Sequence, residues 1–91
     1  MSEPAVVEVH LFAAARAAAG APRLEVAAGS LAEVLERLVA QAPDLAGVLP
    51  RCSYLLDEVA VRPSELDRAI PAGSRLDVLP VRRGIEAGRA A

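Results

Sequence analysis

Lysine and tryptophan are absent from this sequence of 91 residues, and cysteine occurs only once. All ten basic residues are arginine, so no lysine is available for a Schiff base or an isopeptide bond. The single cysteine, Cys52, cannot form an internal disulfide, which agrees with a reducing compartment. Because Phe12 and Tyr54 are the only aromatic residues, we expect a core built from leucine and valine.

A strong excess of charge is also missing. The formal net charge is −2, which gives no reason to expect binding to nucleic acid or to an anionic membrane. The opening stretch MSEPAVVEVH has no basic segment ahead of an apolar run, and no later run is long enough to span a bilayer. We therefore expect a cytoplasmic protein, with one domain because the chain is too short for two cores.

Two segments near the N-terminus have the alternation of half-buried strands. In AVVEVHLFA, apolar residues alternate with Glu8 and His10, which predicts a strand over about residues 5 to 13. Gly20 and Pro22 then interrupt regular structure. The alternation resumes in RLEVA, which predicts a second strand, antiparallel to the first.

The segment GSLAEVLERLVAQAP has the pattern of an amphipathic helix. Ser30 and Glu33 stand at the spacing of a capping box, and apolar residues then recur every three or four positions. Pro43 ends this pattern. These features predict a helix from about Leu31 to Gln41 that covers one face of a sheet. For the following DLAGVLP, we expect a turn or a single helical turn.

The second half of the chain contains three more strand-like segments. CSYLLDEVAVRP has apolar runs on both sides of Asp57 and Glu58, which predicts a hairpin whose second arm stops at Pro63. RLDVLPV predicts a last strand ending near Pro80. One main helix and about five strands predict an α+β protein, with the helix on one face of a mixed sheet. This is the outline of the β-grasp, or ubiquitin-like, fold.

Three segments, VHLFAAARAAAG, RCSYLLDEVAVRP and IPAGSRLDVLP, together resemble the MoaD/ThiS family of sulfur carriers. Within the family, the chain is most similar to the small subunits of molybdopterin synthase, from about Val7 to Pro80. The resemblance implies a subunit that is not itself an enzyme and binds no cofactor. Its C-terminal carboxylate would be adenylated by an ATP-dependent, ubiquitin-activating-like adenylyltransferase and then converted to a thiocarboxylate. The large synthase subunit would use that sulfur on a pterin precursor in molybdenum cofactor biosynthesis.

The resemblance also implies a surface that binds these two partners. The chain itself would be a monomer or part of a heterotetramer with the large subunit. The resemblance places Phe12, at the end of the first strand, and Leu79 with Pro80, just before the tail, on this apolar surface. Arg16 matches an arginine that commonly follows the first strand in the family. Core packing is the alternative for Phe12 and Leu79, and a solvated charge is the alternative for Arg16.

The end of the sequence departs from the family pattern, which is a flexible Pro-Pro-x-x-Gly-Gly-like tail. We expect a domain over residues 1–81 and a flexible tail over residues 82–91. Gly84 aligns with the first terminal glycine, whereas Ile85 replaces the second. Three explanations stay open: proteolytic trimming, a degenerate relative that no longer carries sulfur, or a reading-frame change that conceals a Gly-Gly pair.

The remaining residues form no recognisable catalytic or metal-binding motif. His10 is expected on the outer face of the first strand, without the further ligands that a metal site needs. Cys52 is expected to be a packed thiol. The alternatives to a molybdopterin synthase subunit are a carrier for thiamine or cysteine synthesis and a ubiquitin-like binding module that has lost sulfur transfer because the terminal Gly-Gly is absent.

Overall fold

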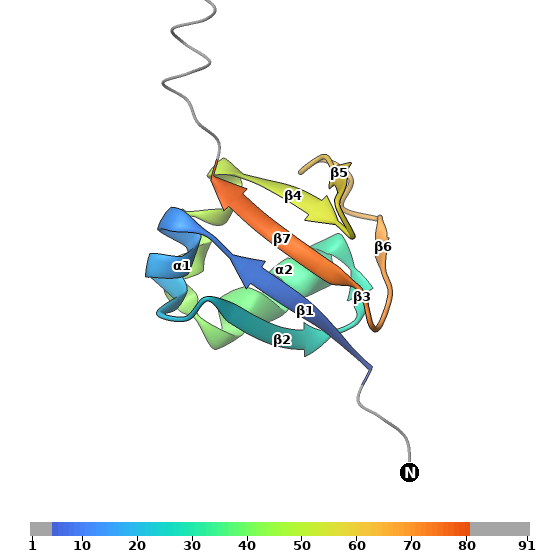
Figure 1. Ribbon diagram of the computed structural model, residues 1–91, viewed down its shortest axis with the longest axis horizontal. Helices are drawn as coiled ribbons and strands as arrows, with labels where there is room; N and C mark the ends of the chain where they lie inside the picture. The colour runs from blue at the N-terminus through green and yellow to red at the C-terminus, as the bar shows by residue number, and fades with distance from the viewer. Residues whose placement is uncertain (1–4, 81–91) are drawn as a thin grey trace, which may run out of the picture.

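A five-stranded mixed sheet forms the centre of the protein in the computed structural model, which describes residues 5–80 (Figure 1). The strands lie in the order β2-β1-β7-β4-β5. β1 and β7 are parallel, whereas the other neighbours are antiparallel, so the prediction of a mixed sheet is confirmed. The strands of this sheet are β1 (Val6–Leu11), β2 (Arg23–Ala27), β4 (Cys52–Leu56), β5 (Val59–Val61) and β7 (Arg75–Pro80).

Alternation along the central strands separates the core from solvent. Val7, Val9 and Leu11 of β1 are buried, while the residues between them are partly exposed. Leu76 and Val78 of β7 are buried on the same side as these core residues. Helix α2 (Leu31–Gln41) covers this inner face and lies behind the sheet in Figure 1. The prediction of a helix on one face of the sheet is thus confirmed.

Helix α2 has the predicted bounds because both of its ends are determined locally. The Ser30 hydroxyl accepts a hydrogen bond from the Glu33 amide at 3.2 Å, and the Glu33 carboxylate accepts one from the Ser30 amide at 2.9 Å. This capping box satisfies amides that a helix start would otherwise leave unpaired. After Gln41, Pro43 begins the 3₁₀ helix η1 (Pro43–Gly47), and η2 (Leu49–Arg51) follows. Two short 3₁₀ helices therefore occupy the segment for which the sequence predicts a turn or a single helical turn.

Helix α1 (Ala13–Ala19) was not predicted, and β1 ends two residues earlier than expected. Gly20 ends this helix in a left-handed conformation (φ 73°), and its amide donates to the Arg16 carbonyl at 2.9 Å. The sequence signals for this helix are the alanines, which are the strongest helix formers, and Gly20, because glycine is the usual residue after a helix end. Helix α1 packs against β7 and η1 and buries Ala15.

A second, two-stranded sheet was also not predicted. It pairs β3 (Gly29–Ser30) with β6 (Ala69–Ile70) in antiparallel orientation. Segments of two residues show no periodicity, so only the tertiary arrangement reveals them.

The β4–β5 hairpin is confirmed. Its two turn residues, Asp57 and Glu58, both have positive φ angles, 48° and 73°, as the tight turns of two-residue hairpins require. The Asp57 side chain accepts a hydrogen bond from the Arg75 amide at 3.0 Å, which joins the turn to β7. No helix within residues 5–80 is long and apolar enough to cross a membrane.

Candidate functional site

The outer face of the sheet, opposite α2, contains two of the residues that the resemblance singled out, Phe12 and Leu79. Phe12 follows the last residue of β1 in extended conformation, and its amide donates to the Val78 carbonyl at 3.2 Å. Leu11 pairs with Val78 in the parallel ladder. Because side chains alternate along a strand, the next residues, Phe12 and Leu79, both face outward at the same end of the sheet.

Phe12 is a surface residue and not part of the core. It is 38% exposed, and only Val59 and Leu66 are similarly exposed among the large apolar residues in positions 5–80. Leu79 is half-buried on β7 and pairs with Ser53 of β4. The core interpretation of Phe12 is therefore excluded, and Leu79 lies at the border between core and surface.

Two residues that the sequence analysis did not select extend this surface. Leu55 of β4 lies diagonal to Leu79, at a distance that large side chains can bridge, and pairs with Ala60 of β5. We refer to Phe12, Leu55, Ala60 and Leu79 as the outer apolar surface. Its sequence signal is the alternation within CSYLL, in which Leu55 takes the opposite face from the buried Tyr54.

The other two residues that the resemblance assigned to partner binding, Pro80 and Arg16, lie on different elements, β7 and α1. Pro80 is half-buried at the end of β7, and alternation directs it toward the helix-covered face, opposite the buried Cys52. Arg16 is exposed on α1, one helical turn after Phe12, and its amide contacts the Phe12 carbonyl at 3.4 Å. The backbone of Arg16 thus lies next to Phe12, whereas Pro80 faces away from the outer apolar surface. Gly84, Ile85 and the rest of the predicted tail lie outside the described residues.

A group of charged side chains occupies the outer face beside the outer apolar surface. His10 Nε2 lies 3.0 Å from Glu8 Oε1, Arg23 lies 3.4 Å from Glu8 Oε2, and Arg75 Nε donates to Asp77 Oδ1 at 2.7 Å. Glu25 lies opposite Glu8 in the register of β1 and β2. The outer charged cluster is defined by these six residues: Glu8, His10, Arg23, Glu25, Arg75 and Asp77.

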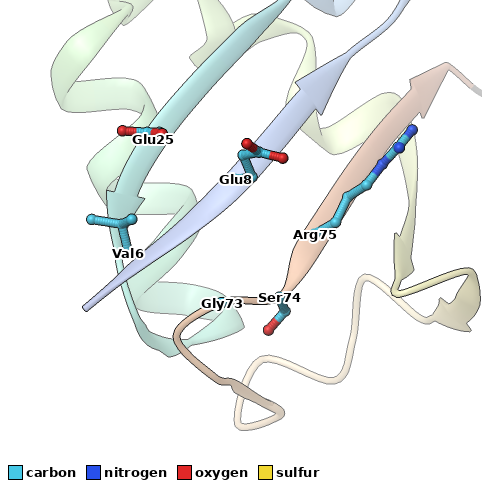
Figure 2. A pocket seen from close by; sticks show the side chains of 6 residues that line it. All are labelled: Val6, Glu8, Glu25, Gly73, Ser74 and Arg75. Carbon is cyan, nitrogen blue, oxygen red and sulfur yellow. The ribbon is translucent and has the colours of Figure 1, made fainter. Parts of the chain in front are cut away.

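Part of this cluster lines a shallow hollow of about 200 Å³. Figure 2 shows Glu8, Glu25 and Arg75 on three adjacent strands around it. The hydrogen bond to His10, followed by the charge of Arg23, lowers the pKa of Glu8. The hydrogen bond to Asp77 raises the pKa of Arg75. These contacts therefore favour the ionised forms of Glu8 and Arg75.

The structure places His10 and Cys52 as the sequence indicated. His10 is partly exposed on the outer face of β1. Cys52 is 1% exposed, its thiol contacts the Val48 carbonyl at 3.3 Å, and burial raises its pKa. Within residues 5–80, no three side chains of histidine, cysteine, aspartate or glutamate are grouped so that they could hold a metal ion.

Comparison with known proteins gives matches only among solved structures, since no protein-family model and no curated protein matches the chain. The solution structure of small archaeal modifier protein 1 (SAMP1) from Methanosarcina acetivorans has a TM-score of 0.76 and 24% identity, over 89% of this chain and 97% of that chain. A crystal structure of SAMP1 from Haloferax volcanii has a TM-score of 0.72 and 25% identity, over 84% and 97% of the two chains.

A third match comes from the complex of subunits 1 and 2 of molybdopterin-converting factor from Helicobacter pylori, with a TM-score of 0.63 and 20% identity. It covers 84% of this chain and 93% of that chain. The predicted β-grasp fold is thus confirmed, since the elements of this chain superpose on the elements of proteins that have it. The structural neighbours of this chain are the SAMP1 and MoaD-type β-grasp proteins, and it shares their fold.

Proposed function

We propose that this chain is a cytoplasmic sulfur-carrier subunit of the molybdopterin synthase type. Its outer apolar surface would bind the large synthase subunit and an adenylyltransferase in turn. The observation that carries this proposal is the exposure of Phe12 next to Leu79, at the end of β7. An exposed aromatic side chain beside further apolar residues is typical of a protein interface.

The position of this surface suits a carrier whose C-terminal carboxylate is the reactive group. β7 ends at Pro80, so the chain continues toward its C-terminus from the edge of the outer apolar surface. A partner that binds Phe12 and Leu79 therefore holds the start of the segment that must enter its active site. The structural neighbour from Helicobacter pylori is solved together with subunit 2 of the same factor, which supports a partner of this kind.

The chemistry would belong to the partners, because a carboxylate becomes a good electrophile only when its oxygen is converted to a leaving group. The carboxylate attacks ATP to form an acyl adenylate and release pyrophosphate. A sulfur nucleophile then displaces AMP and leaves a thiocarboxylate. ATP is consumed by the adenylyltransferase, and this chain supplies the carboxylate and the docking surface.

A ubiquitin-like modifier is the second candidate, because the SAMP1 structures match this chain with the higher TM-scores. A carrier for thiamine or cysteine synthesis would use the same fold. A binding module without sulfur transfer is the candidate suggested by Gly84-Ile85, which stands where the family has two glycines.

Docking can be tested by isothermal titration calorimetry with the large synthase subunit from the same organism. We expect Phe12→Asp and Leu79→Asp each to weaken binding at least about tenfold, since each would desolvate a charge at the centre of the interface. Leu66→Asp is the matched control, because Leu66 is 47% exposed and lies outside the sheet. Circular dichroism must show that all variants fold. Equal binding by Phe12→Asp and Leu66→Asp would contradict the proposed surface.

Sulfur transfer needs a separate assay. The protein from its native source is incubated with the adenylyltransferase, ATP and a sulfur donor, and its intact mass is measured with fragmentation of the C-terminal peptide. A mass gain corresponding to one sulfur in place of one oxygen supports the carrier. Docking without such a gain favours the binding module instead, and attachment to amines of other proteins favours the modifier.

A further inference from the structure

His10 occupies the centre of the outer charged cluster, where neighbouring strands bring opposite charges around it. On its own strand, the Glu8 carboxylate accepts a hydrogen bond from His10 Nε2 at 3.0 Å. Asp77 is its register partner on β7, and Arg23 is its register partner on β2. The imidazole is 23% exposed and Asp77 is 11% exposed, so both are already partly shielded from water.

The charge of the whole cluster depends on this one histidine. β1 contributes Glu8, β2 contributes Arg23 and Glu25, and β7 contributes Arg75 and Asp77. Without a proton on His10, two guanidinium groups face three carboxylates, which leaves one negative charge. With the proton, the cluster is neutral. Histidine is the side chain that ordinarily changes its charge between pH 5 and pH 8.

A partner on the outer apolar surface must also cover this cluster. His10 is two residues before Phe12 on the same face of the chain, a separation of roughly 7 Å. A standard interface buries about 800 Å² per partner, which corresponds to a patch roughly 30 Å across. A patch of that size around Phe12 and Leu79 includes His10 and Asp77. Desolvating a neutral, internally paired cluster costs less than desolvating one with an uncompensated charge.

We propose that partner docking on this face is coupled to protonation of His10, so that the complex is tighter at low pH. The inference rests on the proposed docking function and adds a regulatory property to the same surface. Docking takes up a proton at the imidazole when the free chain is neutral there. By linkage, uptake of up to one proton can change the dissociation constant by at most tenfold per pH unit.

The test measures the affinity of the folded chain for the large synthase subunit at pH 8.0 and pH 5.5, by calorimetry at constant ionic strength. His10→Gln is the matched variant, because glutamine can still donate a hydrogen bond to Glu8 but does not titrate. We expect the wild-type chain to gain about three- to tenfold more affinity on acidification than His10→Gln gains. Comparing the two chains with one partner cancels the titration of the partner.

A second readout counts protons directly. Calorimetry at pH 7.0 in buffers of different ionisation enthalpy reports proton uptake on binding, which is expected for the wild-type chain and absent for His10→Gln. Equal pH dependence and equal proton uptake in the two chains would overturn the coupling and leave the docking function intact. No binding of either chain at either pH would refute the docking function, and the coupling with it.

Discussion

The single tyrosine allows the core to be tested by its response to alkaline pH. Tyr54 is 2% exposed on β4, and its hydroxyl donates a hydrogen bond to the Leu49 carbonyl at 2.9 Å. Burial, with a smaller effect of Cys52, raises the pKa of Tyr54 from 10.0 to about 12. Because the phenol is held in its protonated form, the folded state should lose stability when the unfolded chain can ionise.

The sign follows from the order in which the two states lose their protons. As the pH rises above 10, the unfolded chain releases the phenolic proton while the folded chain retains it. The free energy of unfolding then falls by about 1.4 kcal/mol per pH unit until the folded-state pKa is reached, about 2.7 kcal/mol in total. This contribution is fully present below pH 10. Lysine side chains, which also titrate near pH 10, are absent from the sequence, so they do not add to this change in stability.

The assay is urea unfolding of the wild-type chain and Tyr54→Phe at pH 8.0 and pH 11.5. At pH 8.0 we expect the variant to be less stable by about 1–2 kcal/mol, because the Leu49 carbonyl loses its partner. At pH 11.5 the wild-type chain should have lost about 2 kcal/mol more than the variant, so the difference disappears or reverses. Phenolate absorbance reports Tyr54 alone, since no other tyrosine or tryptophan is present.

The buried thiol is a second group whose ionisation affects stability at alkaline pH, and its charge also acts on Tyr54. Burial raises the pKa of Cys52 as well, so its contribution to stability also falls with rising pH. Both chains are therefore measured in the Cys52→Ala background. In this background, the chains with tyrosine and with phenylalanine at position 54 should still differ. If both lose the same stability between the two pH values, or if the phenol of the folded chain ionises near pH 10, the proposed role of Tyr54 burial is wrong.

Two further predictions concern the start of α2. Ser30→Ala should lower the free energy of unfolding by about 1 kcal/mol in urea titrations, because it removes the hydroxyl that accepts from the Glu33 amide; an unchanged midpoint would contradict the cap. Gly29→Ala should cost about 1 kcal/mol by thermal unfolding, since its Cβ would lie 2.5 Å from Glu33 Oε1 and 2.7 Å from an Arg37 nitrogen and so displace both side chains. The displaced atoms would lose their hydrogen bonds to the Ser30 amide and to the carbonyls of residues 27 and 28. Gly47→Ala meets nothing within 4 Å, so a similar loss there would refute the steric explanation.

Most elements could be predicted from the sequence because their causes are local. The Ser30–Glu33 capping box and the proline at position 43 bound α2, and the two-residue turn at Asp57 and Glu58 defines the β4–β5 hairpin. Helix α1 was not predicted, because a segment made almost entirely of alanine has no amphipathic pattern. β3 and β6 could not be predicted, because they pair only when the segment before β6 folds back to the start of α2.

The candidate site was predicted only in part. The resemblance pointed to Phe12, Leu79, Pro80 and Arg16. The structure places Phe12 and Leu79 at one end of the outer face and Arg16 on the adjoining helix α1. Pro80 differs, because alternation along β7 directs it toward the helix-covered face. Leu55 and Ala60 could not be selected, because their position beside Leu79 depends on the pairing of β4 with β5 and β7. The outer charged cluster could not be predicted for the same reason, because its residues come from three strands that only the fold brings together. In the sequence they cannot be told from ordinary solvated charges.

By itself, the sequence determined the extent of α2, the hairpin, the alternation that buries one face of each strand, and a basic complement made only of arginine. Side-chain periodicity and capping act over a few residues, so they can be recognised locally. Only the tertiary structure decided that β1 lies between β2 and β7, which brings Phe12 to Leu79 and His10 to Asp77. Several strands share the same alternation, and the choice among their pairings depends on packing of the whole core around α2.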